Sequence, residues 1–229
     1  MKSLLSLLII LIAPAAGCKN QVPKVTAEQK TIEKGMDTIQ SKAEQTLKKY
    51  SSYQEDSLLE FLHIDSRKMV EPFNSLAYKE LLKRKTVNMQ KLVQSVNTAD
   101  YTSLLNLLAV RKLNEQAYRQ IPDSQKRSIL VDALSKSKTF NTWGFPHLKM
   151  EDASLALIEI GEYAIPNLRP LLNDCRDALL WGDEEYYEYQ KFKYRLCDFA
   201  MIFIKRINKE QFTIPESPEE RDKIIAQMK

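Results

Sequence analysis

The chain has 229 residues, with 34 basic and 30 acidic side chains and a formal net charge of +4. Because both signs are intermixed, no strongly cationic face is expected, and nucleic acid is a poor candidate for a partner. Glycine occurs only five times, below its usual share of about 7%. No segment alternates apolar and polar residues as a half-buried strand does. The composition therefore predicts an all-α protein.

The N-terminal residues have the order of a secretory signal. Lys2 precedes an apolar run from Leu4 to Ile12, and small residues then lead into Cys18. This order resembles the lipobox of bacterial lipoproteins, although Ala15 stands where that family prefers a branched aliphatic residue. The resemblance implies that residues 1–17 are removed as a signal peptide and that Cys18 receives diacylglycerol and fatty acyl chains such as palmitate.

Two alternatives to lipidation remain open. One is an ordinary signal peptide cut near Ala16, and the other is a retained helical anchor. A membrane span needs about 20 apolar residues, and Pro14 interrupts this run earlier. The lipobox resemblance implies a protein of the bacterial cell envelope that is held at a membrane through Cys18. Because Lys19 and not Asp follows the cysteine, the periplasmic face of the outer membrane is favoured over the inner membrane.

After the anchor, residues 18–55 are expected to form a lipidated tether and an amphipathic stalk helix, and residues 56–229 an all-helical domain. The stalk helix is predicted from Thr26 to about Lys49, with one apolar residue every three or four positions. Further helices are predicted by the same spacing at 56–64, at 74–96, from Thr98 or Asp100 to Leu113, and from Pro122 and Asp123 to about Leu134.

The C-terminal half has the clearest helix boundaries. A helix is expected from Met150 to Ile160, and Gly161 is expected to end it in the left-handed conformation. Pro166 suits the first turn of the next helix, which continues to Asn173.

Two more helices are predicted near the C-terminus. Asp183 is expected to cap one long helix that continues through Tyr194 to Ile207. Ser217 and Glu220 have the spacing of a capping box, which predicts a last helix that extends to about Met228.

The segment from Ala156 to Asp174 resembles a HEAT-like repeat. A helix ends in an aliphatic-glycine turn, and Ala-Ile-Pro-Asn-Leu at 164–168 then opens a second helix that closes on Leu-Leu-Asn-Asp. Residues 194–200 resemble the start of a following unit, and the segment from Trp143 onwards is similar to an uncharacterised family of exported HEAT-like proteins. The resemblance implies helix pairs that stack into a solenoid, because each pair covers the apolar face of its neighbour. An irregular bundle is the alternative for the helices upstream.

Two side-chain pairs are expected in this half. The HEAT-like resemblance implies a charge ladder between neighbouring units, in which Asp174 and Arg195 form one ion pair. Cys175 and Cys197 lie in stretches that should pack together, and an exported chain is in an oxidising compartment where a disulfide is permitted. The alternative is two small buried apolar side chains.

Two clusters are candidates for ligand or partner contact. The first is the loop over 140–147, and the second is the acidic and aromatic stretch from Asp177 to Tyr189. Aromatic rings beside carboxylates are typical of carbohydrate clefts, and two carboxylates can hydrolyse a glycosidic bond. The simpler alternative is that the rings pack in the core and the carboxylates stabilise a helix N-terminus. The candidate contact residues are Trp143, His147, Trp181, Asp183, Glu185 and Tyr186.

Neither His63 nor His147 has a second ligand at a metal-binding spacing, and no nucleophile motif or phosphate-binding glycine loop occurs. No catalytic residue, metal or cofactor is therefore predicted. We expect a membrane-anchored binding or scaffolding lipoprotein whose helical surface contacts another envelope protein. The alternative is an enzyme that acts on envelope carbohydrate or peptide through the Asp177 to Tyr189 cluster.

Overall fold

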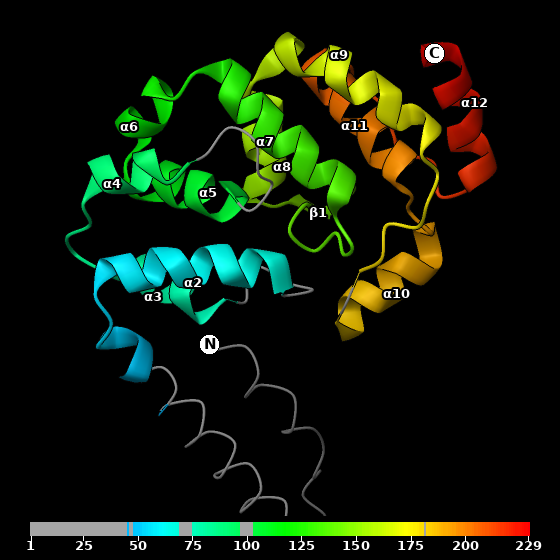
Figure 1. The fold of residues 1–229 in the computed structure, drawn as a ribbon. Coiled ribbons are helices and arrows are strands. Elements are labelled where there is room, and N and C mark those ends of the chain that lie inside the picture. The colour runs from blue at the N-terminus through cyan, green and yellow to red at the C-terminus, as the bar shows by residue number, and fades with distance from the viewer. Residues whose placement is uncertain (1–44, 46–47, 69–74, 97–102, 181) are drawn as a thin grey trace, which may run out of the picture. The chain divides into compact units, whose positions relative to one another are not determined.

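The computed structural model describes residues 45, 48–68, 75–96, 103–180 and 182–229 (Figure 1). The predicted signal peptide, the lipidation of Cys18 and most of the predicted stalk helix lie outside the described residues. Residues Gln45–Lys229 form one compact unit. Within its described part nearly all regular structure is helical, and the sheet found there has two strands of two residues each. The predicted all-α fold class is confirmed.

The N-terminal half of this unit packs around one buried helix, α5. Every residue from Ser103 to Val110 is buried, because α5 contacts α2, α3, α4, α6, α7 and α8. A helix that is apolar on all sides must be enclosed on all sides. The helices of this half are α2 (Glu55–Lys68), α3 (Leu76–Leu81), α4 (Met89–Gln94), α5 (Ser103–Leu113), α6 (Glu115–Gln120) and α7 (Asp123–Lys136).

The single helix predicted over 74–96 is wrong, because the chain forms α3 and α4 with a break between them. The side chain of Asn88 caps α4 by accepting a hydrogen bond from Lys91 N at 3.1 Å. The carboxylate of Glu55 accepts a hydrogen bond from Asn88 N, and Arg84 donates to the carbonyl of Tyr53. Contacts with residues about 30 positions earlier therefore override the helical spacing.

The C-terminal half begins with a hairpin. β1 (Gly144–Phe145) pairs antiparallel with β2 (Lys149–Met150), and this short sheet was not predicted. α8 (Asp152–Glu159) ends as expected at Gly161, where φ is +72°. After α8 the chain forms a 3₁₀ turn, then a short α-helix with Pro166 in its first turn, and then a second 3₁₀ segment. The elements are η2 (Gly161–Ala164), α9 (Ile165–Leu168) and η3 (Arg169–Asn173).

The long helix predicted from Asp183 to Ile207 is wrong, since it is interrupted between α10 (Asp183–Phe192) and α11 (Leu196–Ile207). Lys193 adopts a left-handed φ of 48°, which ends α10. Tyr194 and Leu196 instead pair with an extended segment, because Ala178 N donates to Tyr194 O at 2.8 Å and Leu196 N donates to Arg176 O at 3.0 Å. Gly182, not Asp183, is the N-cap of α10.

α11 is the central helix of the C-terminal half. It is buried without interruption from Leu196 to Ile204, and it packs against α8, α9, η3 and α12 (Pro218–Met228). Ser217 caps α12 as predicted, by accepting a hydrogen bond from Glu220 N at 3.4 Å. None of the described helices is both long and apolar enough to span a membrane.

Candidate functional site

The candidate site is the region where α10 joins the helical body. Figure 1 shows α10 set away from α9, α11 and α12 at one edge of the ribbon. We call the side chains at the C-terminal attachment of α10 the α10 base. They are His147, Glu188, Phe192, Tyr194, Arg195, Asp198 and Arg221.

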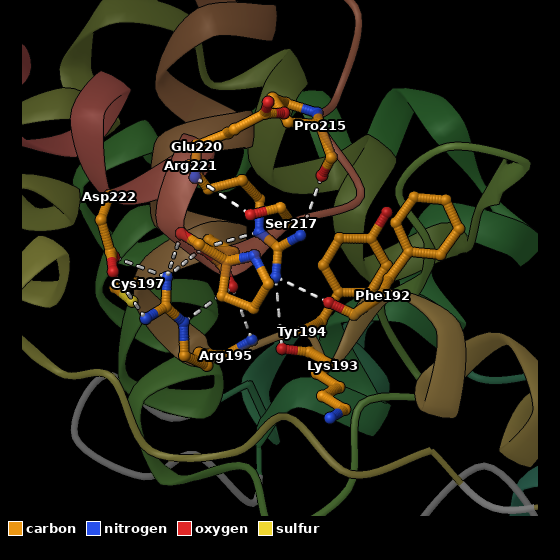
Figure 2. Close-up of polar contacts among 12 residues, drawn as sticks. Phe192, Lys193, Tyr194, Arg195, Cys197, Pro215, Ser217, Glu220, Arg221 and Asp222 are labelled. Atoms are coloured by element: carbon orange, nitrogen blue, oxygen red, sulfur yellow. Dashed lines mark hydrogen bonds and ion pairs between the residues drawn. The ribbon is translucent and has the colours of Figure 1, made fainter.

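A buried charge network forms one side of the α10 base (Figure 2). The side chains of Asp198 and Arg221 are fully buried, and Arg221 Nε lies 3.1 Å from Asp198 Oδ1. Arg195 lies 3.0 Å from the same carboxylate oxygen and 2.7 Å from Asp222 Oδ1. Two guanidinium groups therefore face two carboxylates, and this balance of charge offsets part of the cost of burying them.

Arg221 also joins two segments of backbone, as Figure 2 shows. One terminal nitrogen donates to the carbonyl oxygens of Phe192 at 2.7 Å and Lys193 at 3.3 Å. The other donates to the carbonyl oxygens of Pro215 at 2.8 Å and Glu216 at 2.6 Å. One side chain of α12 therefore fixes the end of α10 and the loop before α12.

The predicted ion pair between Asp174 and Arg195 is wrong. Arg195 pairs with Asp198 and Asp222, while Asp174 lies 3.8 Å from Arg176. The physical reason is the capping of α11. Arg195 is its N-cap residue, and Asp198 Oδ2 accepts a hydrogen bond from Arg195 N at 2.9 Å. Asp198 and Asp222 together bind the guanidinium of Arg195 in place of Asp174.

His147 forms the other side of the α10 base and connects it to the hairpin. Its Nε2 lies 2.8 Å from Glu188 Oε2, and its Nδ1 lies 3.0 Å from the Tyr194 hydroxyl. The imidazole stacks on Phe192, with ring centroids 4.0 Å apart. Burial lowers the pKa of His147, while Glu188 acts in the opposite direction. The ring is therefore neutral at pH 7, with one nitrogen in contact with Glu188 and the other with the Tyr194 hydroxyl.

We expect the protein to lose stability as the pH falls from 7.5 to 5.5. The pKa of His147 in the folded state is below its ordinary value of 6.5, so the unfolded chain binds more protons near pH 6. The stability that neutral His147 contributes is present above its unfolded pKa of 6.5 and is lost as the pH falls through its lower pKa in the folded state. Thermal unfolding measured across this range should show a smaller decrease in Tm for His147→Gln than for wild type. Equal decreases would contradict this assignment.

Cys175 and Cys197 are neighbours, as the predicted disulfide requires, but both are free thiols in this structure. Their Sγ atoms are 2.6 Å apart. Cys175 is exposed, whereas Cys197 is buried in the first turn of α11. Burial raises the pKa of the Cys197 thiol, as does its contact with Cys175. The two thiols therefore differ in their access to solvent.

Trp143 lies in the core, and its complete burial excludes the predicted contact with a ligand or partner. Its indole Nε1 donates to Ser137 Oγ at 2.8 Å, and its carbonyl accepts from Ser154 Oγ at 2.5 Å. Its ring packs edge-on against Phe203. The simpler alternative, in which the ring packs in the core, therefore holds for Trp143.

The other predicted contact residues are distributed around α10. Trp181 and the side chain of Asp183 lie outside the described residues. Glu185 is half-buried, with its carboxylate in the space beside Gly182 that a Cβ atom there would occupy. Tyr186 is 59% exposed. Trp143, His147 and Glu185 therefore do not line one common cleft.

The sequence did not identify several residues that matter in this region. Tyr187 lies in the predicted acidic and aromatic stretch but was not singled out as a contact residue, and it is 70% exposed on α10. Arg221 looks like an ordinary charged position of a surface helix, and no local pattern marks it as buried. Asp198 lies in an apolar stretch, but its partner Arg221 is 23 positions away. Glu188 lies 41 positions from His147, so their pairing depends on the fold alone.

Within the described residues, no group of three or more His, Cys, Asp or Glu side chains could hold a metal ion. Comparison of the chain with known family models, with characterised proteins and with solved structures found no match. The lipobox and the HEAT-like repeat therefore remain predictions from the residues that carry them.

Proposed function

We propose that this protein is a lipid-anchored binding protein whose helical body presents α10 to another protein of the bacterial envelope. The observation that carries the proposal is the pair of tyrosines on a projecting helix. Tyr186 and Tyr187 are 59% and 70% exposed. Tyrosine is enriched among the residues that dominate binding energy at protein interfaces. Two adjacent exposed rings therefore form the centre of the proposed interface.

The α10 base supports this proposal because it fixes the helix before any partner arrives. The carbonyl groups of Phe192 and Lys193 are bound to Arg221, and Glu188 is bound to His147. A surface that is already ordered loses less conformational entropy on binding. The tyrosines are thus presented by a helix whose C-terminal end is held from two sides.

The predicted anchor supplies the location. If Cys18 is lipidated, the body is confined close to the membrane, and its effective concentration towards partners there rises without any new contact. The lipobox resemblance supports this part of the proposal, and Lys19 favours the periplasmic face of the outer membrane. The enzyme alternative relied on the Asp177 to Tyr189 cluster, and Trp143, another aromatic candidate for a carbohydrate cleft, is fully buried.

A photo-crosslinking experiment in intact cells tests the proposal. A photoreactive amino acid at Gln190, an exposed position one turn after Tyr186, is expected to capture one envelope protein. In this background, Tyr186→Ala with Tyr187→Ala should lower the yield about tenfold or more, since truncating a dominant interface residue costs about 2 kcal/mol or more.

Two controls complete the design. Tyr163→Ala removes a tyrosine that is equally exposed, at 70%, but lies on η2, and it should leave the yield unchanged. Cys18→Ser should remove the anchor and lower the yield while leaving the fold intact. An unchanged yield for the double tyrosine variant contradicts the proposed surface. An unchanged yield for Cys18→Ser contradicts the role of the anchor.

A further inference from the structure

The two segments that flank α10 are paired with each other through their backbones. Asp177 lies opposite Arg195 in an antiparallel bridge. Ala178 N donates to Tyr194 O at 2.8 Å, and Leu196 N donates to Arg176 O at 3.0 Å. Cys175 and Cys197 follow the bridge at its outer end, one residue beyond Arg176 and one beyond Leu196. The backbone alone therefore brings the two cysteines together.

Their position next to the bridge favours close side chains. Leu196, the last residue bonded across the bridge, begins α11, so Cys197 lies in the first turn of a helix that starts beside Arg176. Cys197 N also donates to Asp174 O at 2.8 Å. The contact of the Sγ atoms at 2.6 Å agrees with this backbone geometry.

We propose that Cys175 and Cys197 are a redox pair that closes a disulfide around the segment carrying α10. The inference goes beyond the proposed function, because the bond forms whether or not a partner is present. The closed loop contains the whole of α10 and both segments of the antiparallel bridge. Arg221 holds the C-terminal end of α10, and the disulfide would tie the chain before α10 to the start of α11.

The oxidant in this reaction is a disulfide, either of a small thiol such as glutathione or of a protein. The Cys175 thiolate attacks one sulfur of the oxidant, the S–S bond of the oxidant breaks, and one thiol leaves with a proton. The Cys197 thiolate then attacks Cys175 Sγ, the mixed disulfide breaks, and the second thiol leaves with a proton. Two cysteine thiols are oxidised to one disulfide, and the oxidant is reduced to two thiols.

The order of attack follows from exposure. Cys175 is exposed and Cys197 is buried, so only Cys175 meets an external disulfide without local opening. Cys197 then needs to reach only the neighbouring sulfur. Burial also raises the pKa of Cys197, which makes it the poorer first nucleophile. The exposed cysteine is therefore the entry point, and the buried cysteine resolves the intermediate.

The test uses the full chain with Cys18→Ser, so that the pair supplies the only two thiols. The folded protein is incubated with oxidised glutathione, quenched in acid, denatured and alkylated with a maleimide. Mass spectrometry should show no alkylation, a mass lower by two hydrogen atoms, and a peptide linking Cys175 to Cys197. After dithiothreitol treatment, two maleimide groups should add.

The single variants test the order of attack and keep the experiment informative. Cys197→Ser should accumulate one glutathione on Cys175, because the resolving thiol is absent. Cys175→Ser, a change at an exposed position, should react with glutathione disulfide at least about tenfold more slowly, since buried thiols are inert. Two alkylated thiols in the oxidised wild type, or a lasting glutathione adduct on it, would overturn the proposal. These readouts involve no partner, so their failure is distinct from failure of the tyrosine test.

Discussion

Replacing Arg221 by alanine is expected to lower the free energy of unfolding by about 3–5 kcal/mol, the usual cost of breaking a buried ion pair by removing one partner. Arg221 is fully buried, and its loss leaves the buried Asp198 with Arg195 as its remaining cationic partner. The backbone carbonyls of Phe192 and Pro215 also lose their donor. Chemical denaturation followed by circular dichroism measures the effect.

Two variants define what the Arg221 result means. Arg221→Lys keeps the charge but should recover little of the stability, because one ammonium group cannot bind the same planar set of acceptors. Asp222→Asn changes a half-exposed member of the network and should cost about 1 kcal/mol or less. A loss below about 1 kcal/mol for Arg221→Ala would mean that water replaces the guanidinium. The network would then not be the element that fixes α10.

The parts of the fold that follow local rules were predictable from the sequence. Gly161 ends α8 because only a residue that tolerates a φ of +72° suits that position. Ser217 caps α12, and Asp123 begins α7. Each of these signals lies within one helical turn of the boundary that it sets. The run of apolar residues in α5 likewise indicated burial, although not which helices enclose it.

The parts that failed depend on partners distant in sequence. The helix predicted through Tyr194 is interrupted because that residue pairs with Ala178. The break between α3 and α4 depends on Glu55 and Tyr53. Helical spacing reports which residues share a face, but it is silent on whether a distant backbone competes for the same hydrogen bonds.

The same limit explains the mixed outcome for the candidate site. Trp143 and Tyr186 were both proposed as contacts, yet the first is fully buried and the second is 59% exposed. An aromatic residue beside polar neighbours suits either a core or an interface, and only the fold separates the two. Arg221 shows the converse case, because a charged residue in a polar helix is normally exposed.

Replacing Trp143 by alanine is the second change with a large expected effect, about 3–5 kcal/mol of lost unfolding free energy. The indole is fully buried beside Phe203, and its Nε1 is bonded to Ser137. Alanine would leave a cavity and remove the hydrogen bond that Ser137 Oγ accepts, whereas Trp143→Phe keeps much of the volume and should cost roughly half as much. Denaturant unfolding followed by circular dichroism measures both.

The Trp143 variants also separate the core from the binding surface. At a temperature where Trp143→Phe remains folded, the yield of photo-crosslinking at Gln190 should equal that of wild type, because the indole has no exposed surface to offer a partner. Tyr186→Ala with Tyr187→Ala should give the opposite result, a stable fold with a lost crosslink. Surface substitutions away from buried features usually change stability by about 0.5 kcal/mol or less. If Trp143→Phe lost the crosslink while remaining folded, the binding surface would have to include residues of the β1–β2 hairpin next to Trp143.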